Sequence, residues 1–383
     1  MRIVLATPVY PPEIGGPATY TKELSLRLRD KHEIVIVAYA STSEIIPGTT
    51  LFVASKQHPL PLRILKFTFD LFRASQGADV IYVQNAMAAG LPAVIVGMIR
   101  RIPVILKFVG DEAWERASQQ RRTKKRLEEF LEKPEGGWQT TLRMIIQGFV
   151  LRHVNIVTTP SAYLRDAIVR TYRIKKERAV VNYNAAEKDA EAPFSAAIVP
   201  YQIVTTARLV EWKGIDGIIR AVAILKKQFP DVRAVIAGDG PEEEKLKALA
   251  KEFGVDNCIK FTGRISRAET WHLRKSSEVY VLNSTYEGLP HTALTSFAAR
   301  IPMVATDIPG TNEAVYNEIN GLLVPAGDDK ALADAVARLF NDPVLRAKLV
   351  DGAEKILNEK FSWDAHIKTL FGFFESVQAK PRN

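Results

Sequence analysis

The chain has 383 residues, of which 47% are hydrophobic and 25% are charged, and its formal net charge is +9. This length exceeds what a single hydrophobic core usually reaches, so we expect two α/β domains. The single cysteine, Cys258, excludes an internal disulfide and favours a reducing compartment, the cytoplasm. The first ten residues read as a buried strand instead of a signal peptide, and no apolar run is long enough to cross a bilayer.

The first half of the chain alternates short β-branched runs with longer helical patterns, beginning with a strand at 2–6 and a helix at 18–28. This alternation predicts a parallel sheet with crossover helices. The further strands that we expect lie at residues 33–38, 79–84, 103–108, 155–159 and 179–183. We assign residues 1–185 to an N-terminal domain of the doubly wound, Rossmann-like type.

The basic excess belongs to this first half, where residues 1–185 carry 27 Lys and Arg against 16 Asp and Glu. Such a surface could serve anionic lipid, an acidic acceptor or nucleic acid, or simply keep the protein in solution. We set nucleic acid aside because the basic stretches lack interleaved aromatic residues and no nucleic-acid-binding module is legible.

Two basic stretches of the first half could contact a membrane surface, and each also has an ordinary structural interpretation. In residues 59–73 the apolar side chains Leu62, Leu65, Phe69 and Phe72 recur at helical spacing among cations, as in a helix at a membrane interface. An ordinary crossover helix packed on its own sheet has the same pattern, and we favour that interpretation. The stretch at 116–126 could lie against anionic head groups at the inner face of the membrane, or be a solvated helix face.

Residues 186–199 are small and charged without an apolar period, which indicates an interdomain linker. The second half then repeats the α/β scheme, and we assign 200–363 to a C-terminal Rossmann-like domain and 364–383 to a C-terminal helix that could pack back on the first domain. The expected strands are 201–207, 233–238, 258–263, 279–283 and 302–306, with a helix at 241–253. Two such domains in tandem predict a deep cleft between the carboxyl ends of their sheets.

Residues that could bind a diphosphate and a sugar follow the strands of the second half. Arg208 and Lys213 come directly after the first of these strands, where two cations could neutralise a pyrophosphate without a metal. Glu287 follows the strand 279–283 and precedes a helix whose free N–H groups suit an anion. Its carboxylate could bind the hydroxyl groups of a sugar. Gly240 and Arg264 lie in strand-end turns. For Gly240 we favour a structural role, and for Arg264 a plain turn explains the position equally well.

These segments resemble the ordered motifs of the family-4 retaining glycosyltransferases, which have the GT-B fold of two Rossmann-like domains. The resemblance rests on five motifs of the C-terminal half and on the loop Pro11-Pro12-Glu13-Ile14-Gly15-Gly16; the five are Arg208…Lys213-Gly214, Ala237-Gly238-Asp239-Gly240-Pro241, Glu287-Gly288-Leu289-Pro290, Pro309-Gly310…Glu313 and Asn320-Gly321-Leu322-Leu323-Val324-Pro325.

Family membership implies a nucleoside-diphosphate sugar as donor, with UDP- and GDP-sugars both open, retention of the anomeric configuration, and no cofactor or obligatory metal. For the acceptor, the basic N-terminal domain favours a lipid-linked or cell-envelope saccharide over a soluble small molecule. The resemblance assigns donor binding to Gly15, Gly16, Arg208, Lys213, Gly240, Arg264, Glu287, Gly288, Leu289 and Thr295. Catalytic roles fall to Asp111, Arg208, Lys213 and Glu287, and acceptor binding to Gly16, Asp111 and Glu112.

The sequence departs from the family pattern at two places. Thr295 stands where relatives have a second glutamate that holds the ribose, and one hydroxyl cannot chelate two hydroxyl groups as a carboxylate does. After the strand 103–108 many relatives have a histidine, whereas this chain has Asp111 as the candidate that could orient the acceptor. Asp111 could equally be the N-cap of a helix.

We expect attack on the same face as the departing diphosphate, because no nucleophile is evident beside the sugar. Two alternatives stay open at this point. The chain could be a non-catalytic sugar-nucleotide-binding subunit in which Thr295 reflects decay, or a sugar-nucleotide epimerase that needs no acceptor.

Overall fold

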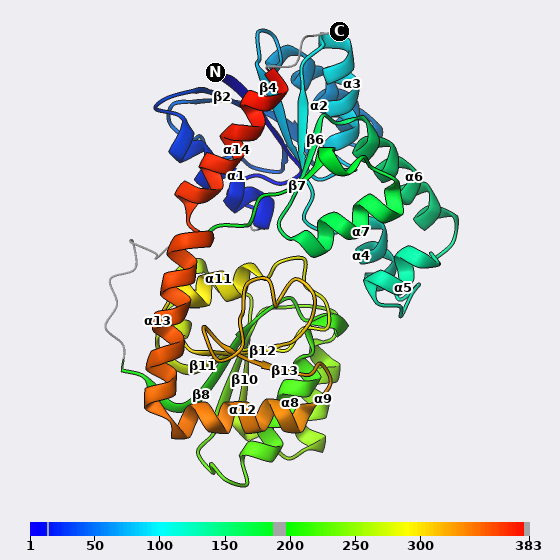
Figure 1. Ribbon diagram of the computed structural model, residues 1–383. Helices are drawn as coiled ribbons and strands as arrows, with labels where there is room; N and C mark the ends of the chain where they lie inside the picture. Colours follow the sequence, from blue (N-terminus) through cyan, green and yellow to red (C-terminus); the bar gives the residue numbers. More distant parts are fainter. Residues whose placement is uncertain (14, 187–196, 379–383) are drawn as a thin grey trace. The chain divides into compact units, whose positions relative to one another are not determined.

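The computed structural model describes residues 1–13, 15–186 and 197–378, and it divides into two compact units (Figure 1). The first unit comprises Met1–Asn182 together with the chain from Lys368 onward, and the second comprises Tyr183–Ile367. Each unit is a parallel sheet with helices on both faces, so the predicted α/β class with two Rossmann-like domains is confirmed. Most of the predicted linker, 186–199, lies outside the described residues.

The N-terminal unit contains a seven-stranded sheet in the order β3-β2-β1-β4-β5-β6-β7, within the part of the chain that the structure describes. The strands are β1 Arg2–Thr7, β2 Glu33–Ala40, β3 Thr49–Ser55, β4 Val80–Gln84, β5 Val104–Lys107, β6 Ile156–Thr159 and β7 Ala179–Val181. The helices are α1 Gly16–Leu28, α2 Leu60–Ala74, α3 Gly90–Arg100, α4 Glu112–Gln119, α5 Leu127–Glu132, α6 Trp138–His153 and α7 Ala162–Tyr172, together with the part of α14, Trp363–Gln378, that begins at Lys368.

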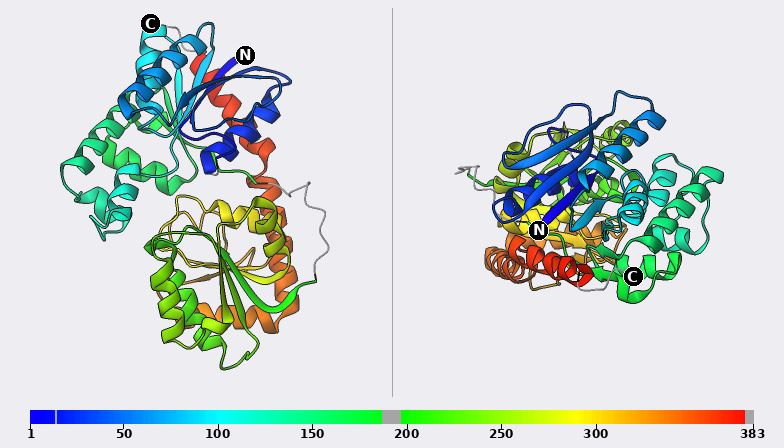
Figure 2. Two further views of the ribbon diagram at one scale, coloured as in Figure 1. Left: turned by 180° about the vertical axis from the view of Figure 1, so that it is seen from behind. Right: turned by 90° about the horizontal axis from the view of Figure 1, so that it is seen from above.

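Strand order reverses between β1 and β4, because the chain builds outward from β1 to β3 and then returns to β4 on the other side. Right-handed crossovers therefore place α1 on one face of the sheet and α2 and α3 on the other. Figures 1 and 2 show this arrangement, with α14 on the side of α1. Helix α6 contacts α3, so α2, α3 and α6 form one layer.

Helix α14 supplies aromatic side chains to the N-terminal unit although it comes from the end of the chain. The ring centroids of Phe371 and His32 lie 4.7 Å apart. Phe374 contacts Tyr82 of β4 edge-on, with 5.8 Å between their ring centroids. Phe374 is completely buried, so the helix contributes to the core of this unit.

The second unit contains a six-stranded sheet in the order β10-β9-β8-β11-β12-β13, again among the described residues. The strands are β8 Val199–Thr206, β9 Arg233–Ala237, β10 Ile259–Gly263, β11 Ser277–Leu282, β12 Met303–Thr306 and β13 Leu322–Val324. The helices are α8 Ile215–Leu225, α9 Glu243–Glu252, α10 Arg267–Lys275, α11 His291–Ala298, α12 Asp329–Asn341 and α13 Pro343–Lys360.

Alternate residues of the central strand β11 enter two separate hydrophobic clusters. Val279 and Val281 pack with α8 and α12 on one face, whereas Tyr280 and Leu282 pack with α11 and α13 on the other. This period of two places apolar side chains on both faces and explains why the strand reads as a continuous apolar run.

The structure corrects three sequence-based expectations. The edge strand β3 was not expected, although Thr49–Ser55 has the β-branched composition of a strand. Helix α1 begins at Gly16 instead of residue 18, with Pro17 in its first turn, where the fixed φ of proline suits a helix. Helix α9 begins at Glu243 instead of 241, because residues 241 and 242 form a turn. In α2 the apolar stripe that we expected to pack on the sheet faces outward: Leu62, Leu65 and Phe69 are exposed.

The buried side of α2 consists of Phe67, Leu71 and Ala74 with Asp70, which forms an ion pair with Lys66. The helix is thus a crossover helix, but it has a second apolar side that its own sheet does not cover. Of the helices that the structure describes, none has the combined length and apolar character needed to cross a membrane.

Candidate functional site

The second unit has its topological switch point between β8 and β11, since β9 and β10 extend the sheet to one side and β12 and β13 to the other. Ligands of open α/β sheets bind outside the carboxyl ends of the strands at such a point. Lys213 lies in the loop after β8 and Glu287 in the loop after β11, so the two predicted site residues meet there.

Backbone contacts fix the loop after β8 against the loop after β11. The carbonyl of Trp212 accepts a hydrogen bond from the Thr285 amide at 2.8 Å, and the carbonyl of Gly214 accepts one from Asn283 Nδ2 at 2.8 Å. Gly214 has the left-handed φ of 61°, and a Cβ there would lie 2.0 Å from the carbonyl oxygen of Asn283. Only glycine fits between the two loops.

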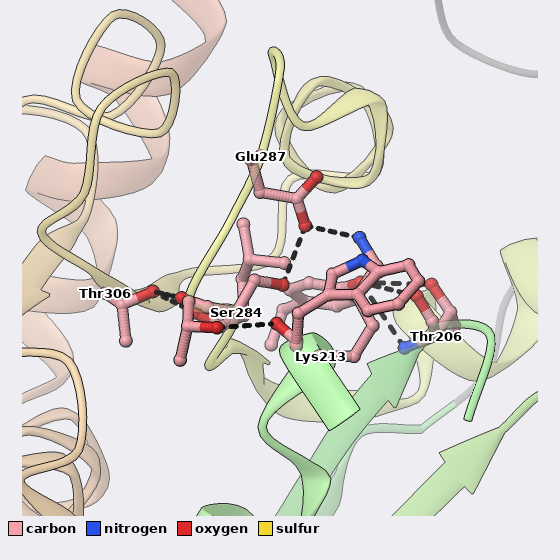
Figure 3. A network of polar contacts seen from close by, with 9 residues as sticks. Thr206, Lys213, Ser284, Glu287 and Thr306 are labelled. Atoms are coloured by element: carbon pink, nitrogen blue, oxygen red, sulfur yellow. Dashed lines mark hydrogen bonds and ion pairs between the residues drawn. The ribbon is translucent and has the colours of Figure 1, made fainter. Parts of the chain in front are cut away.

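Lys213 and Glu287 form an ion pair at this point, with 2.6 Å between Nζ and Oε1 (Figure 3). Ser284 Oγ donates to the same carboxylate oxygen at 2.7 Å, and the hydroxyl of Thr306 on β12 donates to the Ser284 carbonyl. The Glu287 carboxylate is largely buried and the Lys213 ammonium partly so. The site thus presents one cation and one anion side by side, held by the loops after β8 and β11 and by the last residue of β12.

The other residues of this unit that are predicted to bind the donor lie in loops that follow strands of the same sheet or on α11. Arg208 is exposed after β8, whereas Arg264 pairs with Asp239 at 3.1 Å on the surface. A Cβ at Gly240 would lie 2.3 Å from the Leu209 carbonyl oxygen, so close packing of two loops accounts for this glycine. Gly288 is partly exposed and Leu289 is buried after Glu287.

Thr295 lies on α11 and is partly exposed. Its hydroxyl donates to carbonyls of its own helix, those of His291 at 3.2 Å and Thr292 at 3.0 Å. A hydroxyl has one proton, so the remaining capacity of Thr295 toward a ligand is that of an acceptor.

In the N-terminal unit the strand order reverses between β1 and β4, and the glycine loop lies after β1 at this point. Gly15 is the N-cap of α1 and has an extended backbone, and Gly16 is exposed as the first residue of the helix. A Cβ at Gly16 would meet no described atom within 4 Å. The packing of the described residues therefore does not require a glycine at this position.

Asp111 is the N-cap of α4, which is one of the two roles that the sequence allowed. Its carboxylate accepts hydrogen bonds from the Trp114 amide at 2.9 Å, from Gln147 Nε2 at 2.7 Å and from Tyr172 Oη at 2.5 Å. Burial raises the pKa of the carboxyl, although these hydrogen bonds oppose the shift. The fully buried carboxylate is engaged by its own unit, and a role of Asp111 in orienting the acceptor stays a prediction.

The neighbouring Glu112 has the partly exposed carboxylate that Asp111 lacks. It accepts a hydrogen bond from Asn85 Nδ2 at 2.7 Å, which joins the end of β4 to the end of β5. Asn85 has a left-handed φ of 77° and caps the turn that follows with its side-chain oxygen. Sequence analysis missed Asn85, although a polar residue directly after a buried strand was the available signal. It also missed Ser284, which follows β11 in the same way.

Lys107 is a buried cation at the end of β5, and sequence analysis did not single it out. Its ammonium lies 4.3 Å from the centre of the Tyr20 ring, and burial lowers its pKa from 10.5 to about 7. Since the unfolded chain binds a proton that the folded state releases above pH 7, the free energy of unfolding should rise as the pH increases from about 7 toward 10.5.

We therefore expect Lys107→Met to remove this rise in the free energy of unfolding. Its gain in stability over the unaltered protein should be largest below pH 7. Urea unfolding at pH 6, 7.5 and 9 measures the difference, with Lys31→Met as the control for an exposed lysine of the same unit. Stability curves of Lys107→Met and the unaltered protein that stay parallel over this range would contradict the assignment.

Within the described ranges, no group of three or more His, Cys, Asp or Glu side chains is arranged to hold a metal ion. The charges of the site described above are those of Lys213, Glu287 and the neighbouring Arg208.

Comparison with known proteins gives a matching family model for each of the two units. The family model described as Glycosyl transferase 4-like domain matches residues 15–185, and the model described as Glycosyl transferases group 1 matches residues 191–356. The lipopolysaccharide core biosynthesis glycosyltransferase LpsD of Rhizobium meliloti is 32% identical over 51% of this chain and 54% of its own. The chain thus spans about half the length of this relative.

Two relatives align over nearly the whole chain at lower identity. Glycogen synthase of Mycobacterium tuberculosis is 24% identical over 95% of this chain and 92% of its own, and alpha-monoglucosyldiacylglycerol synthase of Streptococcus pneumoniae is 23% identical over 96% and 85%. Among solved structures, Anabaena HepE in complex with UDP covers 98% of this chain and 100% of its own, with a TM-score of 0.75 and 18% identity. At this identity the likeness shows the GT-B fold.

Proposed function

Because the chain belongs to the family of glycosyltransferases whose two models match its two units, we propose that it transfers a sugar from a nucleoside-diphosphate sugar to a saccharide or lipid-linked acceptor. In this proposal the unit Tyr183–Ile367 binds the donor and the N-terminal unit binds the acceptor.

The observation that carries the proposal is the Lys213–Glu287 pair at the switch point of the second sheet. A diphosphate needs a cation and a sugar needs a hydrogen-bond acceptor for its hydroxyl groups, and the pair offers both within one ion-pair distance. On donor binding, the diphosphate replaces Glu287 as the partner of Lys213, and the carboxylate becomes available to the sugar. Ser284 holds the carboxylate in place during this exchange.

We propose that transfer proceeds with retention of configuration and without a metal. The bond between C1 of the sugar and the diphosphate oxygen breaks, and its electron pair leaves with the diphosphate. The acceptor oxygen forms its bond to C1 on the same face and gives its proton to a diphosphate oxygen. Lys213, Arg208 and the N-terminus of α11 stabilise the negative charge that develops on the leaving group.

For the donor we propose a UDP- or GDP-sugar. UDP is the first candidate because HepE, which has the same fold, was crystallised with UDP and with UDP-glucose. For the acceptor, the names of two relatives, one acting in lipopolysaccharide core biosynthesis and one a diacylglycerol glucoside synthase, support a cell-envelope saccharide or lipid-linked acceptor. On the acceptor side we propose Gly16 and Glu112, whose carboxylate is partly exposed.

A thermal-shift screen against UDP, GDP and their sugar derivatives tests the donor site first. A ligand at about 100 times its Kd stabilises the folded state by about 2.7 kcal/mol, which should raise Tm by several degrees. We expect a shift with one nucleotide family only. In Glu287→Ala the shift with the sugar derivative should be smaller than in the unaltered protein, whereas the shift with the free nucleoside diphosphate should remain, because only the sugar hydroxyls bind the carboxylate. If none of the compounds shifts the Tm of the unaltered protein, the proposed donor site is wrong.

Turnover assays with the donor so identified then test the reaction. We expect transfer to a saccharide or lipid-linked acceptor, an unchanged rate in EDTA, and an NMR coupling constant showing the anomeric configuration of the donor. Binding of the donor without transfer would support a sugar-nucleotide-binding subunit instead. Conversion of the donor sugar in the absence of any acceptor would support an epimerase.

A further inference from the structure

Three neighbouring helices of the N-terminal unit expose large apolar side chains to solvent. Twelve of the nineteen exposed large apolar side chains in the described part of the chain lie on α2, α3 and α6, although these helices comprise only 42 residues. We call this surface the outer face; its members are Leu60, Leu62, Ile64, Leu65, Phe69, Ile95, Met98, Ile99, Trp138, Leu142, Ile145 and Phe149.

Contacts link the three helices that carry the outer face. Helix α2 contacts α3, and α3 contacts α6. The Arg100 guanidinium of α3 lies 3.7 Å from the centre of the Phe72 ring of α2. At the other end of α3, a Cβ at Gly90 would lie 3.0 Å from the Val150 side chain of α6. The exposed apolar side chains of the outer face are therefore carried by helices that are linked by direct contacts.

Each helix contributes a stripe that points away from the sheet. On α6 the exposed residues Trp138, Leu142, Ile145 and Phe149 recur every three or four positions, while Val150 and Leu151 are buried. The exposed fractions are high, at 67% for Leu65, 66% for Ile99, 60% for Ile145 and 73% for Trp138. Monomeric soluble proteins rarely expose contiguous apolar surface of this kind, and such patches mark interaction sites.

The charges among these side chains are almost all positive. The three helices carry six Lys and Arg, with His153 at the end of α6, against a single acid. That acid, Asp70, is buried and paired with Lys66 at 2.6 Å. Of the six cations, Lys66, Arg73 and Arg152 are exposed and the other three are half-buried. These three helices thus carry exposed apolar side chains and exposed cations, and no exposed carboxylate.

We propose that the outer face is a docking surface for an anionic lipid bilayer. Apolar side chains on a helix that lies along an interface enter the boundary between head groups and acyl chains, and neighbouring Lys and Arg contact the phosphates. A net negative bilayer complements this surface in charge, whereas a second copy of the face would bring cations against cations. The docking surface goes beyond the proposed glycosyl transfer and does not require it.

Flotation with lipid vesicles tests this proposal without any measurement of turnover. We expect the protein to float with vesicles of phosphatidylcholine and phosphatidylglycerol, to bind vesicles of phosphatidylcholine alone much more weakly, and to lose binding as salt screens the charges. In the triple variant Leu65→Ser, Ile99→Ser and Ile145→Ser, binding should fall by about tenfold or more, because each substitution removes apolar area from the bilayer contact.

The matched control replaces three exposed apolar residues of the other unit: Phe253→Ser, Ile319→Ser and Val344→Ser. This control should float like the unaltered protein. Both triple variants should have the Tm of the unaltered protein, because all six positions are exposed. The proposal is overturned if the unaltered protein binds neither kind of vesicle, or if both triple variants bind alike. Dimerisation that the first triple variant abolishes, without vesicle binding, would assign the outer face to a second copy of the chain.

Discussion

Replacement of Lys213 by alanine is expected to lower kcat about 100- to 1,000-fold, the usual cost of removing one preorganised group that stabilises developing charge. The ammonium lies at the switch point where the proposed diphosphate would leave, 2.6 Å from Glu287. Without it, the negative charge of the leaving group would be met mainly by Arg208 and the N-terminus of α11. The measurement is steady-state turnover with the donor found by thermal shift.

The same substitution removes the ionic partner of a largely buried carboxylate, so a loss of stability must be separated from a loss of catalysis. The Tm of each protein without ligand shows any loss of stability. Rates measured at a temperature well below both Tm values then report the loss of catalysis alone. Lys245→Ala is the matched control, because Lys245 is an exposed lysine of the same unit that pairs with Glu242 on α9. A kcat for Lys213→Ala within about twofold of the control would refute the proposed charge stabilisation.

Gly214→Ala should destabilise the second unit by about 3 kcal/mol or more, since it combines a left-handed backbone with a steric overlap. The new Cβ would lie 2.0 Å from the Asn283 carbonyl oxygen, and only separation of the loops after β8 and β11 relieves the clash. Separation would also move Lys213 away from Glu287. We therefore expect a lower free energy of unfolding in urea together with weaker donor binding.

Gly254→Ala is the control that isolates the overlap. Gly254 has nearly the same φ, 65°, but a Cβ there would meet no described atom within 4 Å. The left-handed backbone should destabilise both alanine variants by about 1 kcal/mol. Only Gly214→Ala should lose further stability, because only there does the new Cβ overlap another atom. Equal losses of stability in the two variants would show that the loops are not held as closely as we describe.

Much of the fold was predictable because buried parallel strands read as apolar, β-branched runs. Tyr280, Val281 and Leu282 are apolar in succession because both faces of β11 are covered. The edge strand β3 was missed because several of its residues are only partly buried, so its apolar run is weaker. In α2 the sequence showed which residues share a stripe, but not which of two apolar stripes meets the sheet.

The site was predictable to the level of the loops and not to the level of side-chain partners. Residues that follow strands lie at one edge of a parallel sheet, so Lys213 and Glu287 could be expected near each other. Their direct ion pair depends on the close approach that Gly214 permits, which spacing alone does not reveal. For Asp111, two of the contacts that engage its carboxylate come from Gln147 and Tyr172, which lie 36 and 61 residues further along the chain.

Helix α14 has a consequence for the order in which the molecule is made. During synthesis the first 182 residues leave the ribosome early. The ring contacts of His32 with Phe371 and of Tyr82 with Phe374 can form only after α14 has been synthesised. The second unit, Tyr183–Ile367, is continuous in the chain and can close while the polypeptide is still growing. The unit that is started first is therefore completed only after the second unit has been synthesised.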